Sequence, residues 1–157
     1  MRAASTASVG SLRPGALAMK RFETIDEDEW DAVMRVNIRG VWQCSKAVVA
    51  EMRKKKYGKI INIASLDGLS LNQQETYSYH ASKAGVIHLT KVMALELAQF
   101  GILVNGIAPG SILTEGTKRL FYGEDGIMSD RAQRMIDHIP LGRPGTVDEI
   151  AVAVAKA

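Results

Sequence analysis

The 157-residue chain contains a single cysteine, Cys44, and aromatic residues make up only 6% of it. One cysteine excludes a disulfide framework and a zinc site built from several thiolates. Apolar runs are only a few residues long, whereas a helix that crosses a bilayer needs about 20 apolar residues. The net charge of +3 is small, and the basic residues are scattered. The composition therefore favours neither a membrane-spanning protein nor a nucleic-acid-binding one.

What is present is the composition of an ordinary globular protein, with 46% hydrophobic and 24% charged residues in about one domain's length. Residues 1–22 differ, because they lack Asp and Glu and are rich in Ala, Ser and Gly. That composition fits an organelle transit peptide, but we favour a flexible leader or the remnant of a longer chain. We therefore expect a leader at 1–22 and one folded domain at 23–157, located in the cytoplasm, where a free thiol persists.

A long helix is predicted over residues 24–56, because apolar residues recur there at three- and four-residue steps. We expect the helix to bend near Asn37 and Gly40. Thr24 and Glu27 have the spacing of a capping box, which would start the helix.

Residues 59–64 and 102–108 are short, apolar and β-branched, as strands buried on both faces should be. A second helix is predicted between them over 76–99, a third near 129–138, and a last one from a capping box at Thr146. This alternation predicts an α/β fold with a parallel sheet. Two strands leave unpaired edges in such a sheet. We therefore interpret the chain as the C-terminal portion of a doubly wound, Rossmann-like domain.

Tyr79 and Lys83 are four residues apart near the start of the second helix, so their side chains lie on one face. A lysine ammonium lowers the pKa of a neighbouring phenol, which can then exchange a proton with a carbonyl or alcohol oxygen. Alone, the spacing also fits a tyrosine in the core followed by a solvated lysine. Ser65 follows the first strand and Pro109 the second, and ligands bind at the carboxyl ends of parallel strands.

Four segments, in this order and spacing, resemble the short-chain dehydrogenases/reductases. They are VNIRG at 36–40, KIINIAS at 59–65, YHASK at 79–83 and PGSILT at 109–114. The resemblance extends over residues 23–157. It implies a partial NAD(P)-binding Rossmann domain and an oxidoreductase that interconverts an alcohol and a ketone. The kinds of enzyme it resembles are 3-oxoacyl-carrier-protein reductases and sugar or polyol dehydrogenases.

The resemblance also implies roles for individual residues. Tyr79 would be the catalytic acid and base, and Ser65 would hold and polarise the substrate oxygen. Lys83 would bind the nicotinamide ribose and lower the pKa of Tyr79, while Asn37 would support a proton relay. The cofactor, NAD or NADP, would be bound by Tyr79, Lys83, Pro109, Gly110, Ile112 and Thr114. No metal is expected, because the three histidines lack the spacing of a metal site.

The family holds the cofactor pyrophosphate on a glycine-rich turn at a helix start. No Gly-x-x-x-Gly-x-Gly sequence occurs among the 157 residues, and the segment that selects NAD or NADP is absent with it. An alternative interpretation is therefore a truncated, inactive paralogue that acts only through its oligomer-interface helices.

The remaining expectations concern partners and the substrate. The resemblance implies a homodimer or homotetramer formed by the helices at 24–56 and 76–99. Partners would be a small carbonyl or alcohol substrate, with neither nucleic acid nor membrane. Residues 111–138 are interpreted as a substrate lid with hinges at two glycines. The hinges are Gly123 and Gly126, and the expected substrate contacts are Leu120, Phe121, Tyr122 and Met128.

Overall fold

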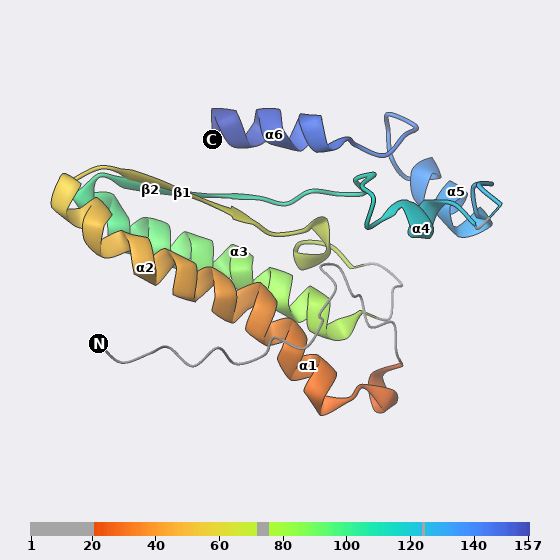
Figure 1. Cartoon of the computed structure of the whole chain (residues 1–157), viewed down its shortest axis with the longest axis horizontal. Coiled ribbons are helices and arrows are strands. Elements are labelled where there is room, and N and C mark those ends of the chain that lie inside the picture. Colours follow the sequence, from red (N-terminus) through yellow and green to blue (C-terminus); the bar gives the residue numbers. More distant parts are fainter. Residues whose placement is uncertain (1–20, 72–75, 124) are drawn as a thin grey trace.

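A computed structural model describes residues 21–71, 76–123 and 125–157 (Figure 1). Residues 1–20, most of the expected leader, lie outside this range. The elements are η1 (Phe22–Thr24), α1 (Glu27–Met34), η2 (Arg35–Arg39), α2 (Gly40–Lys55), β1 (Gly58–Ile63), η3 (Leu66–Gly68), α3 (Tyr77–Leu97), η4 (Ala98–Phe100), β2 (Ile102–Ile107), α4 (Lys118–Phe121), α5 (Asp130–Asp137) and α6 (Val147–Lys156). Within those ranges no helix has both the length and the hydropathy needed to cross a bilayer.

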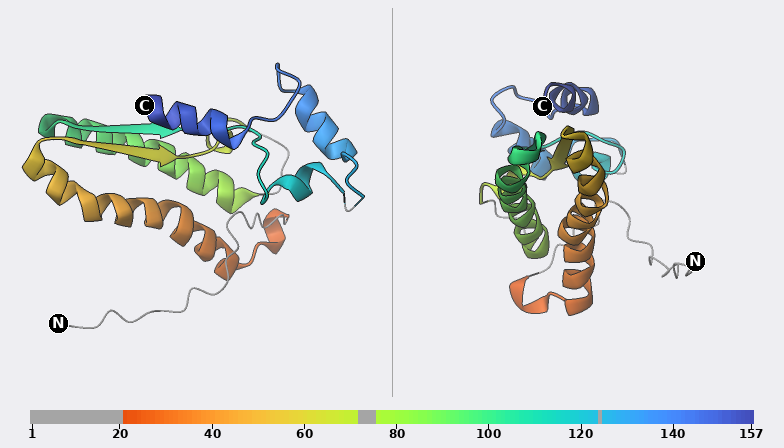
Figure 2. Two further views of the ribbon diagram at one scale, coloured as in Figure 1. Left: turned by 45° about the horizontal axis from the view of Figure 1, so that its top comes forward. Right: turned by 90° about the vertical axis from the view of Figure 1, so that its left-hand side faces the viewer.

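The two strands pair in parallel, with Gly58 opposite Ile102 and Ile63 opposite Ile107. Helices α2 and α3 lie side by side against one face of this sheet, and α6 lies on the other (Figures 1 and 2). The α/β class and the parallel sheet predicted from the sequence are confirmed.

The expectation that both strands are buried on both faces is wrong. The side chains of Ile102 and Val104 point into the main core, whereas Leu103 and Ile63 are 55% and 42% exposed. The reason is that the long helices cover only one face. On the other face, the Asn105 Nδ2 atom donates a hydrogen bond to the carbonyl oxygen of Ala157, 2.9 Å away, at the end of α6.

The long N-terminal helix has a π-helical interruption where the sequence predicts a bend. Residues 35–39 form a π-helical turn between α1 and α2, and such a turn widens the helix and changes its direction. The predicted capping box at Thr24 and Glu27 is wrong. Asp26 caps α1 instead, because its carboxylate accepts a hydrogen bond of 2.8 Å from the backbone N–H of Asp28.

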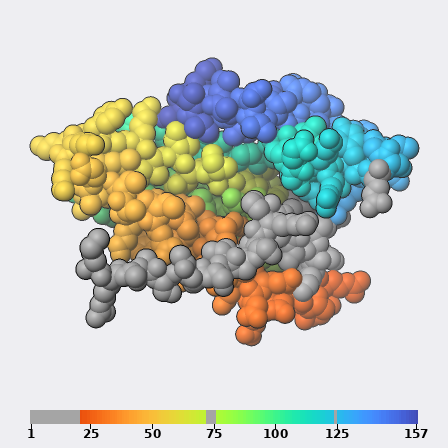
Figure 3. Space-filling model, in the orientation of Figure 1, coloured from red at the N-terminus to blue at the C-terminus, as the bar shows by residue number. Residues whose placement is uncertain are grey.

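Residues 113–144 form a separate lobe at one end of the molecule, seen in teal and blue in Figure 3. Backbone hydrogen bonds tie its base: Leu113 N–H donates to the Gly145 carbonyl (2.9 Å), and Gly145 N–H to the Ser111 carbonyl (2.8 Å). The lobe has a small core around Phe121, which is 2% exposed. The expected contact of Phe121 with a substrate is therefore wrong, because its ring packs inside the lobe.

Candidate active site

A cavity of about 330 Å³ lies at the carboxyl ends of β1 and β2. The backbone brings these ends together, because Ala64 N–H donates to Ile107 and Leu66 N–H donates to Pro109, at 2.7 and 2.9 Å. Seven of the eight site residues predicted from the sequence line the cavity. They are Ser65, Tyr79, Lys83, Pro109, Gly110, Ile112 and Thr114.

Ser65 and Tyr79 line this cavity together. The Ser65 side chain is nearly buried, and its interaction with the Tyr79 hydroxyl is one of the influences on the pKa of that phenol. The Ser65 Oγ atom also accepts a hydrogen bond of 3.2 Å from the backbone N–H of Asp67, at the start of η3. Since that N–H occupies one lone pair of Oγ, it restricts the orientation of the serine hydroxyl.

The pKa of Tyr79 is raised above its usual value of 10.0, which corrects the expectation that Lys83 lowers it. Burial of the phenol is the main cause. The hydrogen bond with Ser65 opposes the shift, and the negative charge of Asp67 adds to it. At neutral pH the phenol is therefore protonated, and it can donate this proton to a substrate oxygen.

Lys83 lies beside Tyr79 without lowering its pKa in this arrangement. The Lys83 ammonium donates a hydrogen bond of 3.0 Å to the carbonyl of Ile63, and lies 5.6 Å from the centroid of the Tyr79 ring. Burial also lowers the pKa of Lys83 itself. Only one of its three N–H donors is used by Ile63, which leaves two for a ligand in the cavity.

Asn37 is the predicted site residue that does not line the cavity. Its Nδ2 atom donates a hydrogen bond of 3.0 Å to Ser82 Oγ, which in turn donates to the carbonyl of Tyr79 at 2.8 Å. Asn37 is thus connected to the backbone of the α3 turn that carries Tyr79. The π-helical turn at 35–39 is the local structure that holds this amide.

Thr117 is a cavity residue that the sequence reasoning missed. Its hydroxyl accepts a hydrogen bond from Thr114 N–H (2.8 Å) and donates one to the Ile112 carbonyl (2.7 Å). It therefore fixes the backbone of the loop after β2. The sequence feature that could have identified Thr117 is its position three residues after Thr114, because this spacing is typical of a threonine side chain that caps a turn.

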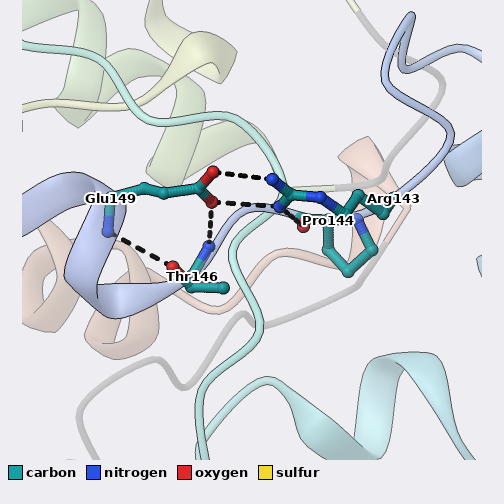
Figure 4. A network of polar contacts seen from close by, with 4 residues as sticks. All are labelled: Arg143, Pro144, Thr146 and Glu149. Carbon is teal, nitrogen blue, oxygen red and sulfur yellow. Dashed lines mark hydrogen bonds and ion pairs between the residues drawn. The ribbon is translucent and has the colours of Figure 1, made fainter.

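Val147 and Ile150 of α6 also line the cavity and were not foreseen. The start of α6 is fixed by the predicted capping box, which is confirmed (Figure 4). Thr146 Oγ1 accepts from Glu149 N–H at 3.2 Å, and Glu149 Oε2 accepts from Thr146 N–H at 2.8 Å. Arg143 donates two further hydrogen bonds to the same carboxylate, of 3.1 and 2.8 Å.

We expect the Glu149 carboxyl to titrate with a midpoint near 2, because Arg143 and the Thr146 N–H hold its pKa at about 2, below the usual 4.5. The cap then stabilises the fold above about pH 4.5, and this stabilisation is lost as the pH falls toward 2. Carboxyl-carbon NMR measures the midpoint directly. Arg143→Met should raise it, and a midpoint near 4.5 in the unmodified protein would contradict the assignment.

No group of three or more His, Cys, Asp or Glu side chains in the described part of the chain is arranged to hold a metal ion. A family model described as short chain dehydrogenase matches residues 8–125. The chain belongs to this family.

Relatives and solved structures show the same affiliation. A 3-oxoacyl-[acyl-carrier-protein] reductase of Synechocystis is 42% identical over 124 residues, covering 79% of this chain and 46% of the relative. A gluconate 5-dehydrogenase from Burkholderia cenocepacia, solved with NADP and tartrate, has a TM-score of 0.79 and 34% identity, with 90% of this chain and 53% of that one covered.

An NAD⁺-bound xylitol dehydrogenase has a TM-score of 0.76 and 31% identity, covering 86% of this chain and 55% of that chain. The chain spans about half the length of the curated relatives it matches. The short-chain dehydrogenase fold is thus shared with enzymes of different substrates.

Proposed function

We propose that this chain carries the proton-transfer site of an NAD(P)-dependent oxidoreductase that interconverts an alcohol and a ketone. The observation that carries the proposal is that Ser65, Tyr79 and the Lys83 ammonium line one cavity, at the carboxyl ends of two parallel strands. The relatives support substrates of the 3-oxoacyl-carrier-protein or sugar and polyol type.

In the reduction direction, the substrate carbonyl oxygen accepts hydrogen bonds from the Ser65 and Tyr79 hydroxyls. The bound nicotinamide supplies the hydride that reaches the carbonyl carbon. As negative charge develops on the oxygen, Tyr79 Oη gives up its proton to it. The phenolate that remains accepts a hydrogen bond from Ser65 and lies close to the Lys83 ammonium. The raised pKa of Tyr79 suits it to the acid role at neutral pH.

The cavity fits the nicotinamide and ribose end of a dinucleotide. Lys83 has two N–H donors for ribose hydroxyls beyond the one that Ile63 accepts, and Pro109, Gly110 and Ile112 line the same cavity. Thr114 stands at the same wall. Asn37 positions the helical turn of Tyr79 through Ser82. The choice between NAD and NADP rests on residues that this cavity does not contain.

The proposed activity is tested by following NADH and NADPH absorbance at millimolar cofactor, with a 3-oxoacyl thioester and with a keto sugar. We expect reduction to proceed through neutral pH and to slow only as the pH rises above about 10, where the tyrosine loses its proton. Oxidation of the product alcohol should need alkaline pH, because it requires the phenolate. Absence of turnover with either cofactor would favour the inactive paralogue.

We also propose a homo-oligomer formed through α2 and α3. The sides of α2 and α3 that face solvent carry apolar side chains, which neither the sheet nor the other of these two helices covers. Among them are Trp42 (46% exposed) and Leu95 (83% exposed). Such uncovered apolar side chains are typical of a protein interface. The exposed free thiol of Cys44 supports a reducing compartment such as the cytoplasm.

Sedimentation velocity is expected to show a dimer or tetramer for the unmodified protein. Leu95→Glu should shift it toward the monomer, because the buried charge would have no partner. Leu141→Glu is the matched control, since Leu141 is 76% exposed but lies in the loop before α6. A stable monomer of the unmodified protein, or equal dissociation by both variants, would contradict this interface.

A further inference from the structure

A second hollow, of about 520 Å³, lies in the lobe formed by residues 113–144. Its lining combines two cations, one carboxylate, a tyrosine ring and two glycines. The lining residues are Glu115, Lys118, Arg119, Tyr122, Gly123 and Gly126. None of them belongs to the cavity of Ser65 and Tyr79.

The helical turn around α4 separates the two cavities. It begins at Thr114, whose carbonyl accepts a hydrogen bond of 2.8 Å from Lys118 N–H. Positions 115, 118, 119 and 122 share one helical face, because they are spaced by three or four residues. Thr114 and Thr117 line the first cavity instead. One short helix therefore presents hydroxyls to the reaction cavity and cations to the second hollow.

The two cations of this hollow form no ion pair with a carboxylate within the part of the chain that the structure describes. Arg53, Lys54, Lys55 and Arg143 each form an ion pair with a glutamate. Among the described residues, Lys118 and Arg119 form none, although Glu115 lies three and four positions before them. Their charges remain available to a ligand. An arginine fork next to a lysine is suited to the oxygens of a carboxylate or phosphate.

We propose that this hollow binds the anionic group, a carboxylate or a phosphate, of the substrate whose carbonyl enters the cavity of Tyr79. The two sites lie on different faces of the turn at 114–122, because Thr114 and Thr117 line one and Lys118 and Arg119 line the other. The substrate is thus an elongated anion, with its carbonyl and its charged group well separated. The assignment of this anion to the substrate rests on the proposed function, whereas anion binding itself does not.

The test measures binding without turnover, so a failure of the proposed oxidoreductase activity would not affect it. Backbone amide NMR of the full chain is recorded during titration with inorganic phosphate, acetate and, as a neutral analogue, acetamide. We expect localised shifts at residues 115–126 with at least one of the two anions and none with acetamide. Phosphate alone would indicate a phosphate ester, and acetate binding as strongly as phosphate would indicate a carboxylate.

The double variant Lys118→Gln/Arg119→Gln should weaken anion binding at least tenfold. The double variant Lys54→Gln/Lys55→Gln removes the same charge from the end of α2, and should leave binding within about twofold. In the unmodified protein the shifts should also diminish with added sodium chloride. Absence of localised shifts, shifts caused equally by acetamide, or equal weakening by both double variants would overturn the proposal.

Discussion

Replacing Tyr79 with phenylalanine is expected to lower the rate of carbonyl reduction by about a hundredfold to ten-thousandfold, the usual contribution of a general acid. The substitution removes one oxygen, and with it the proton that the buried phenol holds at neutral pH. The ring keeps its packing on α3, so cofactor affinity should change little. The rate is measured at millimolar cofactor with a 3-oxoacyl thioester or a keto sugar.

Tyr77→Phe provides the matched control, because Tyr77 lies two residues earlier on the same helix. It is 41% exposed, and its ring packs against Phe22 outside the cavity. This control should retain nearly the full rate. A Tyr79→Phe protein that kept more than a few per cent of the activity would show that the proton comes from another group.

The location of the site was predictable because it follows from strand direction. Residues 59–64 and 102–108 are apolar enough to be recognised as strands, and parallel pairing brings their carboxyl ends to one edge. Ser65 and Pro109 then have to be neighbours. Tyr79 and Lys83 join them because α3 starts near that edge and packs against β2. Each step depends on a periodic or local signal that a sequence carries.

The electrostatics of the site were not predictable from spacing. A Tyr and a Lys four residues apart share a helix face, but their mutual effect depends on what else surrounds them. Here the ammonium of Lys83 bonds to the carbonyl of Ile63, and burial dominates the pKa of Tyr79. Neither the carbonyl nor the depth of burial is encoded in the four-residue interval. The sign of the pKa shift therefore came out opposite to the prediction.

The lobe was only partly predictable for a related reason. The helix at 130–137 has a clear serine cap and apolar spacing, whereas α4 has four residues, too few for a periodic signal. The sequence analysis interprets Phe121 as a substrate contact because it lies in the segment 111–138, taken as a lid with glycine hinges. Its burial depends on long-range packing with Ala132 and Ile136, which no local pattern shows.

The 157-residue protein is expected to bind NADH and NADPH only in the millimolar range, about 4 kcal/mol of binding free energy. The cavity of about 330 Å³ offers partners for the nicotinamide ribose, through Lys83 and the loop after β2. The family's pyrophosphate site consists of backbone N–H groups at a glycine-rich helix start. The sequence contains no such glycine pattern. Calorimetric titration with each dinucleotide measures the affinity.

Reduced nicotinamide mononucleotide tests the reason for this weakness, because it consists of the part of the cofactor that the cavity fits. We expect its affinity to lie within about threefold of that of NADH, since the adenosine half gains no further contacts. Lys83→Met should weaken the mononucleotide and the dinucleotide alike by removing the donors to the ribose. Lys91→Met, on the exposed side of the same helix, should change neither. Micromolar binding of NADH or NADPH, with the mononucleotide far weaker, would instead mean that a phosphate site exists in the sample outside the described cavity, on another segment or a partner chain.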